Sequence, residues 1–445
     1  MELAALIGEL GGLLHTVVTF IVALSIIVTV HEFGHYIVGR WSGIHAEVFS
    51  VGFGPRLASR VDRRGTRWQI AAVPFGGYVK FLGDANAASA GADDATMARL
   101  SPDERRHTMH GAPLWARAAT VFAGPAFNFI LSIAIFAAMA TTTGIATEPP
   151  QVARMLPLPA AYDLKDGDTI LAIDGRPTPD YETLGKVADD LPKSATADYR
   201  VRRDGAELTV TGPTPRQPIV LGVLPKSAAM DAGLKEGDVI IAAAGAPVPR
   251  FIDLRNAVTA SGGRPIALEV WRDGTTFRTE LSARERPVES RDGGFETGYQ
   301  IGVSSGYVFD PATRTPGPVE ALGSGISLTW RVVDQTFSAI HSMVAGRISP
   351  CNVSGPVGMA QAAGAAASAG VSSFIFLVAA LSTAIGLLNL FPIPVLDGGH
   401  LVFHAYEWAF GRQPSDRFMN LAMAAGLTLV LALMLFGLSN DLFCA

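Results

Sequence analysis

The chain of 445 residues is rich in apolar residues and poor in charge, with 49% hydrophobic and 17% charged residues and a net charge of -5. This composition argues against an ordinary soluble protein and favours a membrane protein with attached polar domains. No basic stretch suggests nucleic-acid binding. The two cysteines, Cys351 and Cys444, are too few for a disulfide framework, and two unpaired thiols are expected rather than a pair.

Four apolar segments are each long enough to cross the roughly 30 Å hydrocarbon core of a bilayer. The first is expected to be a retained span, because Glu2 and Glu9 stand where a signal peptide needs Lys or Arg. The predicted spans cover residues 12–39, 118–140, 373–391 and 419–437.

The charges between the spans predict an orientation. Block 40–117 is rich in arginine, and the short loop between the last two spans carries Arg412 and Arg417. Loops with an excess of Lys and Arg usually face the cytoplasm. The N-terminus, block 141–320 and the C-terminus are then expected on the opposite, outer side.

The first span ends in the pentad His31-Glu32-Phe33-Gly34-His35. On a helix, imidazoles four residues apart lie on one face, where both can bind one Zn²⁺, and Glu32 beside them can act as a general base. Ionisable groups at membrane depth are costly and usually functional. The pentad therefore predicts a zinc hydrolase site with His31 and His35 as ligands and Glu32 as the catalytic residue.

Block 141–320 contains an internal repeat. The segment 159–170 matches 227–240, and Arg203-Asp204-Gly205 is echoed by Arg272-Asp273-Gly274 at almost the same offset. Each unit is expected to be a small strand-rich domain with a Leu-Lys-x-Gly-Asp turn, a short helix and, toward its C-terminal end, a hairpin. This pattern resembles a PDZ domain of the bacterial type, twice in tandem.

A PDZ-like domain can hold a peptide against a sheet edge and a helix. In the second unit the groove is expected between the strand 219–224 and the helix 251–258, lined by Ile219, Leu221 and Val223. The alternative is that the two units are spacers that bind no ligand. Binding is expected less of the first unit, whose turn lacks the usual Ala-Gly before Leu164.

Between the repeat and the third span, apolar residues recur three and four positions apart. This spacing predicts an amphipathic helix that lies on the membrane surface or packs on the spans. Its apolar face comprises Ile326, Trp330, Val333, Phe337, Ile340 and Val344.

A catalytic zinc needs three protein ligands, so the pentad is one ligand short. The segment 389–400 ends the third span with two prolines, and irregular backbone at membrane depth is tolerated where it lines a cavity. Asp397 would complete a His, His, Asp set. His400 is the alternative third ligand, and spacing does not decide between the two residues. Asp397 could also serve only as a helix cap.

The pentad and Asn-Leu-Phe-Pro-Ile-Pro-Val-Leu-Asp-Gly-Gly-His together resemble the two signatures of the site-2 protease family of intramembrane zinc proteases. The tandem PDZ-like insertion is similar to the regulator-of-sigma-E protease branch of that family, and the resemblance covers nearly the whole chain. It implies one Zn²⁺ per chain on His31, His35 and Asp397, with Glu32 as base. It also implies that Asn389 holds the substrate backbone.

Two further segments match features of the family. Gly124-Pro125 and Asn128 resemble a motif of the second span, for which a helix kink and a packing amide are the alternative. Residues 67–82 resemble a membrane-associated β-hairpin whose strand edge can accept the backbone of an unwound substrate, although a plain turn is the alternative. The candidate clamp comprises Phe75, Gly76, Gly77, Tyr78, Val79 and Lys80.

The resemblance implies a multi-span α-helical protein of the bacterial inner membrane, with four transmembrane helices, a β-hairpin and two tandem PDZ-like α+β domains between spans two and three. The expected domains are 1–140, 141–215, 216–310, 311–350 and 351–445.

The implied substrates are single-span membrane proteins, of the anti-sigma factor type or signal-peptide remnants. Their outer domain has already been trimmed, and the PDZ pair acts as a size filter. A non-catalytic PDZ scaffold, a zinc transporter and a membrane-anchored zinc protease that acts on soluble peptides are the alternatives.

Overall fold

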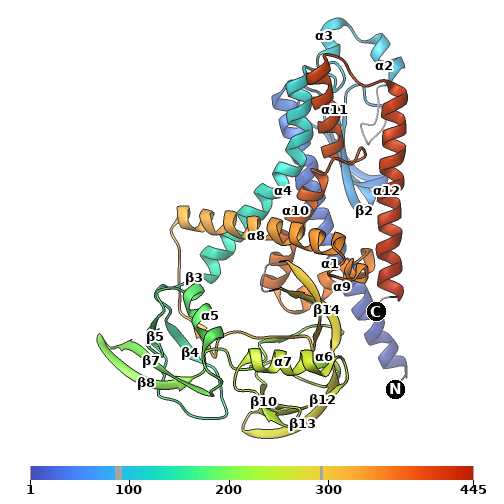
Figure 1. Ribbon diagram of the computed structural model, residues 1–445. Coiled ribbons are helices and arrows are strands. Elements are labelled where there is room, and N and C mark those ends of the chain that lie inside the picture. Colours follow the sequence, from blue (N-terminus) through green and yellow to red (C-terminus); the bar gives the residue numbers. More distant parts are fainter. Residues whose placement is uncertain (1, 86–92, 291–293, 444–445) are drawn as a thin grey trace. The chain divides into compact units, whose positions relative to one another are not determined.

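The computed structural model describes residues 2–85, 93–290 and 294–443, which form two compact units (Figure 1). The helical unit comprises the chain up to Met139, Pro318–Phe337 and the chain from Val353. The strand unit comprises Ala140–Gly317 and Ser338–Asn352. Each unit is described separately below.

Four helices of the described chain are long and apolar enough to cross a membrane, as the four predicted spans require. The protein is therefore a multi-pass membrane protein. These helices are α1 (Glu2–Trp41), α4 (Leu114–Thr143), α10 (Val371–Asn389) and α12 (Asp416–Phe443). The other helices of the helical unit are α2 (Asp94–Arg99), α3 (Pro102–Arg105), α9 (Pro356–Ser368), α11 (Asp397–Phe410) and most of α8 (Pro318–Val344).

Small residues bring the membrane helices close together. A Cβ on Gly34 of α1 would lie 2.4 Å from the carbonyl oxygen of Ala123 on α4, and one on Gly386 of α10 would lie 3.0 Å from the Cβ of Asn128. The Ser382 hydroxyl of α10 also donates to the Asn128 carbonyl at 2.9 Å. In lipid, such close packing and interhelical hydrogen bonds hold helices together in place of the hydrophobic effect.

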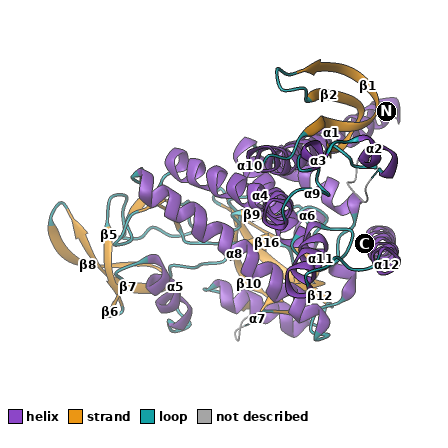
Figure 2. Cartoon of the chain, turned by 90° about the horizontal axis from the view of Figure 1, so that it is seen from above, coloured by secondary structure: helices purple, strands orange, loops and turns teal. Residues whose placement is uncertain are grey.

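Among the described residues of the helical unit, the strands are β1 (Ala46–Val61) and β2 (Arg67–Phe81), orange in Figure 2. They form a long hairpin that bends back on itself, since Phe49 pairs with both Trp68 and Val79. The predicted hairpin of residues 67–82 was therefore incomplete. Its first strand is β1, which ends in a run of nine exposed residues and so gives no clear alternation to detect.

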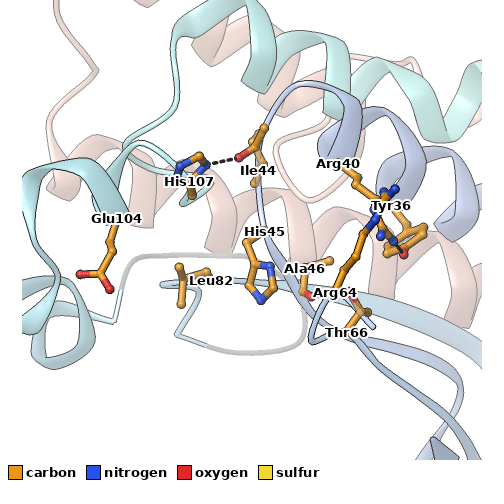
Figure 3. A pocket seen from close by; sticks show the side chains of 11 residues that line it. Tyr36, Arg40, Ile44, His45, Ala46, Arg64, Thr66, Leu82, Glu104 and His107 are labelled. Atoms are coloured by element: carbon orange, nitrogen blue, oxygen red, sulfur yellow. Dashed lines mark hydrogen bonds between the residues drawn. The ribbon is translucent and has the colours of Figure 1, made fainter. Parts of the chain in front are cut away.

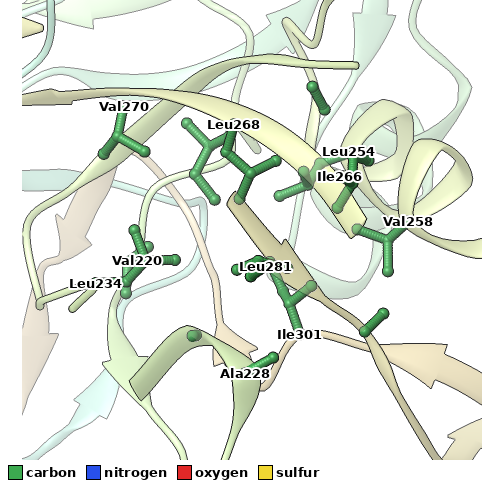
Figure 4. Close-up of a cluster of buried hydrophobic side chains, with 14 of the residues drawn as sticks. Val220, Ala228, Leu234, Leu254, Val258, Ile266, Leu268, Val270, Leu281 and Ile301 are labelled. Carbon is green, nitrogen blue, oxygen red and sulfur yellow. The ribbon is translucent and has the colours of Figure 1, made fainter. Parts of the chain in front are cut away.

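The strand unit contains two modules with the same sheet order, as the sequence repeat predicts. The first sheet runs β6-β5-β7-β8 beside helix α5, and the second runs β11-β10-β12-β13 beside α7. Figure 4 shows the core of the second module, where Leu254 of α7 packs near Ile266 and Leu268. The bounds are β5 (Thr169–Ile173), β6 (Arg176–Pro177), α5 (Tyr181–Asp190), β7 (Thr196–Arg203), β8 (Ala206–Pro213), α6 (Ala228–Asp231), β10 (Val239–Ala243), β11 (Ala246–Pro247), α7 (Phe251–Ser261), β12 (Pro265–Arg272) and β13 (Thr275–Ser282).

One ion pair explains why both sequence echoes occur in each module. Asp168 is fully buried and accepts two hydrogen bonds from the Arg203 guanidinium, both at 2.7 Å. Asp238 is likewise fully buried and accepts two from Arg272, at 2.6 and 2.7 Å. A buried carboxylate needs such a partner. The Gly-Asp turn and the Arg-Asp-Gly turn of each unit are thus two halves of one contact.

The first module is completed by residues that follow the second module. Strand β17 (Phe309–Pro311) pairs with β4 (Val152–Met155), and Val308 and Phe309 are buried in the first core. Strand β18 (Thr313–Arg314) pairs with β3 (Ile145–Ala146) in the same way. The expected boundary between 310 and 311 therefore cuts through β17, because this pairing is between residues far apart in the sequence.

The strand beside α7 differs from the expected one. Strand β9 (Gly222–Val223) pairs with β16 (Val303–Ser304), whereas α7 packs against β15 (Phe295–Gln300), which pairs with β14 (Arg284–Glu289). The predicted groove residues divide accordingly: Ile219 is buried, Val223 is paired within β9, and the N–H of Leu221 donates to the Ser304 carbonyl at 2.9 Å. A groove between 219–224 and α7 is therefore wrong, and the segment beside the helix is β15.

Two regions near the second module also differ from the sequence expectations. Helix α8 begins at Pro318, seven residues after the expected start of its domain at 311, and a 3-10 turn follows it at Pro350–Asn352. Cys351 is disulfide-bonded, so the expectation of unpaired thiols is wrong for this residue. Cys444, the other cysteine of the chain, lies outside the described residues.

Candidate metal centre

Three of the predicted site residues converge in the helical unit. The Nε2 atoms of His31 and His35 lie 3.1 Å apart. Asp397 places Oδ2 3.2 Å from Nε2 of His31 and Oδ1 3.5 Å from Nε2 of His35. One ligand atom from each residue lies within 4.8 Å of the others, and the three side chains are largely buried.

Local structure places each ligand. His31 and His35 lie four residues apart on α1, so they share a face of this helix. After α10 ends at Asn389, the chain folds back and begins α11 at Asp397. A Cβ on Gly398 would lie 2.3 Å from the carbonyl oxygen of Leu390, so only glycine allows this tight return.

The other ring nitrogens of the histidines have partners on α4. His35 donates Nδ1–H to the Thr120 carbonyl at 2.8 Å, which leaves the Nε2 lone pair free for a metal. The Nδ1 atom of His31 lies 3.2 Å from the side-chain amide of Asn128, which is fully buried. Because rotation of that amide exchanges donor and acceptor, Asn128 can serve either tautomer of His31.

Gly124 lets α4 approach both imidazoles. A Cβ at this position would lie 2.3 Å from Nε2 of His35 and 2.8 Å from Cε1 of His31. The match of Gly124 and Asn128 to a family motif thus corresponds to direct contact with the candidate ligands. A helix kink or a packing amide alone does not account for these contacts.

The donor set fits zinc. Two imidazole nitrogens and one carboxylate oxygen are the ligand types of catalytic zinc sites, which keep a fourth position open for water or substrate. His400 lines the same cavity but does not belong to the three-residue group found among the described residues. The geometry therefore favours Asp397 over His400 as the third ligand.

The carboxylate of Glu32 faces the edge of the hairpin. Its Oε2 accepts the backbone N–H of Val79 at 3.1 Å. The other edge of this part of β2 pairs with β1, through Val79 with Phe49 and Gly77 with Val51. A Cβ on Gly77 would lie 2.6 Å from the Ser50 carbonyl oxygen, so glycine is needed for this close pairing.

A cavity of about 470 Å³ joins these groups. Its lining includes His31, Glu32, His35 and Asp397, and of the predicted substrate-binding residues Asn389, Gly77, Tyr78 and Val79. Lys80 instead forms an ion pair with Glu47 at 3.1 Å and does not line the cavity. Gly76 has a positive φ of 113° at the bend of β2, and the side chain of Phe75 lies outside the described residues.

The cavity also contains an ion pair that the sequence analysis missed. Arg117 of α4 is 8% exposed and donates to both carboxylate oxygens of Glu407 on α11, at 3.0 and 2.6 Å. Arg117 was counted as one of many cytoplasmic arginines. In the sequence, the one signal for this ion pair is the carboxylate of Glu407 on the helix that begins at Asp397. Its partner Arg117 lies 290 residues earlier in the chain.

The choice between Asp397 and His400 can be tested by metal content. The Asp397→Asn variant is expected to bind zinc more than about 100-fold more weakly, because loss of even an outer partner costs roughly 10–100-fold. The His400→Asn variant is expected to keep its zinc. Competition of each purified variant with a chelator measures both affinities. The opposite order would assign the third ligand to His400.

Comparison with known proteins gives matches over almost the whole chain. Residues 19–433 match peptidase family M50. A predicted zinc metalloprotease of Rhizobium meliloti is 37% identical over 435 residues, which cover 97% of this chain and 98% of that protein. The regulator of sigma-E protease RseP of Salmonella typhimurium is 33% identical over 461 residues, which cover 97% of this chain and 99% of that protein.

Proposed function

Because this chain belongs to peptidase family M50 of zinc metalloproteases, we propose that it cleaves the membrane segments of single-span membrane proteins. The convergence of His31 and His35 of the first candidate span with Asp397, beside Glu32, is the observation that carries this proposal. Proteins of the anti-sigma factor type are the expected substrates, since RseP is among the relatives, and signal-peptide remnants are a second class.

The chemistry follows from the donor set and the base. We assign one Zn²⁺ per chain to His31, His35 and Asp397. When bound, zinc supplies Lewis-acid chemistry that acidifies water and polarises a carbonyl. Glu32 accepts the proton of the attacking water and returns it to the leaving amine nitrogen. Thr120 holds the His35 imidazole in the required tautomer throughout.

The hairpin edge and Asn389 would position the substrate. A substrate helix has its amides already paired, so its backbone must unwind before a peptide bond can be attacked. Residues 77–79 of β2 present a strand edge beside Glu32, and an unwound segment can add to such an edge as an extra strand. Asn389, at the end of α10, lines the same cavity and would hold the substrate backbone by its amide.

The strand unit would act as a size filter. Its two modules share one strand order, which supports our assignment of both as PDZ-like, and we assign peptide binding to the second. In the first module the Tyr307 ring packs at a tilt of 54° against Tyr181 of α5, and its hydroxyl donates to the Tyr181 carbonyl at 3.1 Å. This contact covers part of the face of α5 that a peptide would use.

The expected orientation follows from charge. The arginines of block 40–117, together with Arg412 and Arg417 between the last two spans, would face the bacterial cytoplasm. The metal centre, at the end of α1 next to that block, would then open toward the cytoplasm. The strand unit and both termini would lie in the periplasm.

Cleavage of a purified single-span reporter tests the proposal. The full chain in bilayer nanodiscs is expected to cut a reporter with a trimmed outer domain and to leave the reporter with an intact domain uncut. A zinc chelator should stop the cleavage, and added Zn²⁺ should restore it. Cleavage of soluble peptides alone would instead indicate a membrane-anchored protease, and the absence of any zinc-dependent cleavage would favour the scaffold.

A further inference from the structure

A second cavity lies where α1 meets the hairpin, and it shares no lining residue with the cavity of the metal centre (Figure 3). Its volume is about 430 Å³, within the range of roughly 300–1,000 Å³ that small-ligand pockets have. Its walls come from the end of α1, the start of β1, the turn before β2 and the segment 104–107. Nothing in the proposed proteolysis uses these residues.

One end of this cavity is cationic. The Arg40 guanidinium lies 3.4 Å from Asp62 and also donates to the Tyr36 hydroxyl. Asp62 accepts the backbone N–H of Arg64 at 2.8 Å, which fixes the turn that carries Arg64. The Arg64 guanidinium is exposed and has no ion pair within the described part of the chain. It is therefore available to an anion.

The other end is anionic. In Figure 3, Glu104 lies across the cavity from Arg40 and Arg64, with His45 and Leu82 between them. Ser101 donates its backbone N–H to the Glu104 carboxylate at 2.9 Å and its hydroxyl at 2.7 Å. The backbone hydrogen bond lowers the pKa of Glu104, so this side chain is charged at neutral pH.

A ligand for such a cavity needs a negative group at one end and a positive group at the other. Arginine binds phosphate with two parallel hydrogen bonds, and a carboxylate binds an ammonium by charge-assisted hydrogen bonds. A simple anion would meet repulsion from Glu104. A zwitterion with a phosphate at one end and an ammonium at the other satisfies both ends.

The position of the cavity indicates the source of this ligand. Tyr36 and Arg40 lie in the last turns of the candidate span Gly11–Trp41. Trp41, the next residue, is 74% exposed, as is typical of tryptophans at the level of lipid headgroups. We propose that this pocket binds the phosphoethanolamine headgroup of a phospholipid, with the phosphate on Arg40 and Arg64 and the ammonium on Glu104.

A bound lipid would connect elements that also build the metal centre. Helix α1 carries Arg40 as well as His31 and His35, and Leu82 directly follows β2, whose residue Val79 donates to Glu32. A headgroup that bridges Arg64 and Glu104 would tie the hairpin turn to α3. Binding should therefore raise the temperature at which the full chain unfolds.

Lipid binding to the full chain tests the proposal without any measurement of proteolysis. The purified protein in detergent is titrated with phosphatidylethanolamine, phosphatidylglycerol or phosphatidylcholine, and bound lipid is counted by native mass spectrometry. Arg64→Ala is expected to weaken phosphatidylethanolamine binding roughly tenfold or more, since it removes a charged hydrogen bond. Glu104→Gln should remove the preference over phosphatidylglycerol. Arg63→Ala is the matched control, because Arg63 lies in the same turn but does not line the cavity.

Several outcomes would overturn the proposal. Equal binding of phosphatidylethanolamine and phosphatidylglycerol by the wild type would indicate a simple anion site. Unchanged binding in Arg64→Ala, or an equal loss in Arg63→Ala, would remove the pocket from the interaction. Soluble glycerophosphoethanolamine that binds as tightly as the lipid would assign the site to a free metabolite instead of the membrane.

Discussion

The Glu32→Gln variant is expected to lose proteolysis by a factor of roughly 10²–10⁴, the usual contribution of a general acid–base group. Glutamine has nearly the same shape, and its carbonyl oxygen can still accept the Val79 N–H that Glu32 accepts at 3.1 Å. It cannot take a proton from water. Since Glu32 is outside the three-residue ligand group, zinc content should stay unchanged.

Single-turnover cleavage of the trimmed reporter, with zinc content measured on the same sample, checks this prediction. Glu47→Gln is the control, because Glu47 lies in the same unit and its carboxylate pairs with Lys80 away from the cavity. Its rate should stay within about twofold of wild type, as exposed ion pairs contribute little. Cleavage by zinc-loaded Glu32→Gln at the wild-type rate would remove Glu32 from the mechanism.

The Gly124→Ala variant is expected to lose both zinc and activity. The added methyl group would lie 2.3 Å from Nε2 of His35 and 2.8 Å from Cε1 of His31, closer than atoms can approach. Either the imidazoles or α4 must move. A shift of about 1 Å in a catalytic group can cost roughly 10²-fold in rate. Helix α4 has little freedom to retreat from the rings, because its Asn128 already packs closely on Gly386 of α10.

Gly323→Ala in α8 is the matched control for this variant. It makes the same change within a helix, but no atom lies within 4 Å of its new methyl group. Alanine is a better helix former than glycine by about 1 kcal/mol, so this control should unfold at the same or a higher temperature. Wild-type zinc content and cleavage in Gly124→Ala would show that the close approach of α4 is dispensable.

The spans and the pentad were predictable because their signals are local. About twenty apolar residues in a row must be buried in a membrane or in a protein core. The two histidines lie four residues apart and must therefore share a face of α1. The repeat was also predictable, since the two copies can be recognised by comparing one segment of the sequence with the other. Its physical reason, the contact of Asp168 with Arg203 and of Asp238 with Arg272, needed the structure.

Pairings between distant segments were not predictable. Strand β17 completes a module that begins more than 150 residues earlier, and β1 was missed because its distal half is exposed. Helix α9, rich in Ala and Gly, carries no apolar period that separates it from a loop. The groove was predicted beside the wrong strand for the same reason. Strand β9 pairs with the distant strand β16, and α7 contacts β15 instead.

The sequence by itself determined that this chain spans the membrane, carries His31, Glu32 and His35 on one helix, and contains two related strand-rich modules. The first two follow from patterns within a single segment, and the third follows from comparing two segments of the chain. Spacing left Asp397 and His400 open as the third ligand, and only the family resemblance chose Asp397. The tertiary structure shows Asp397 beside both histidines and places Gly124 against both rings. Such contacts depend on how α1, α4 and α11 pack, and packing is decided by side chains that lie hundreds of residues apart.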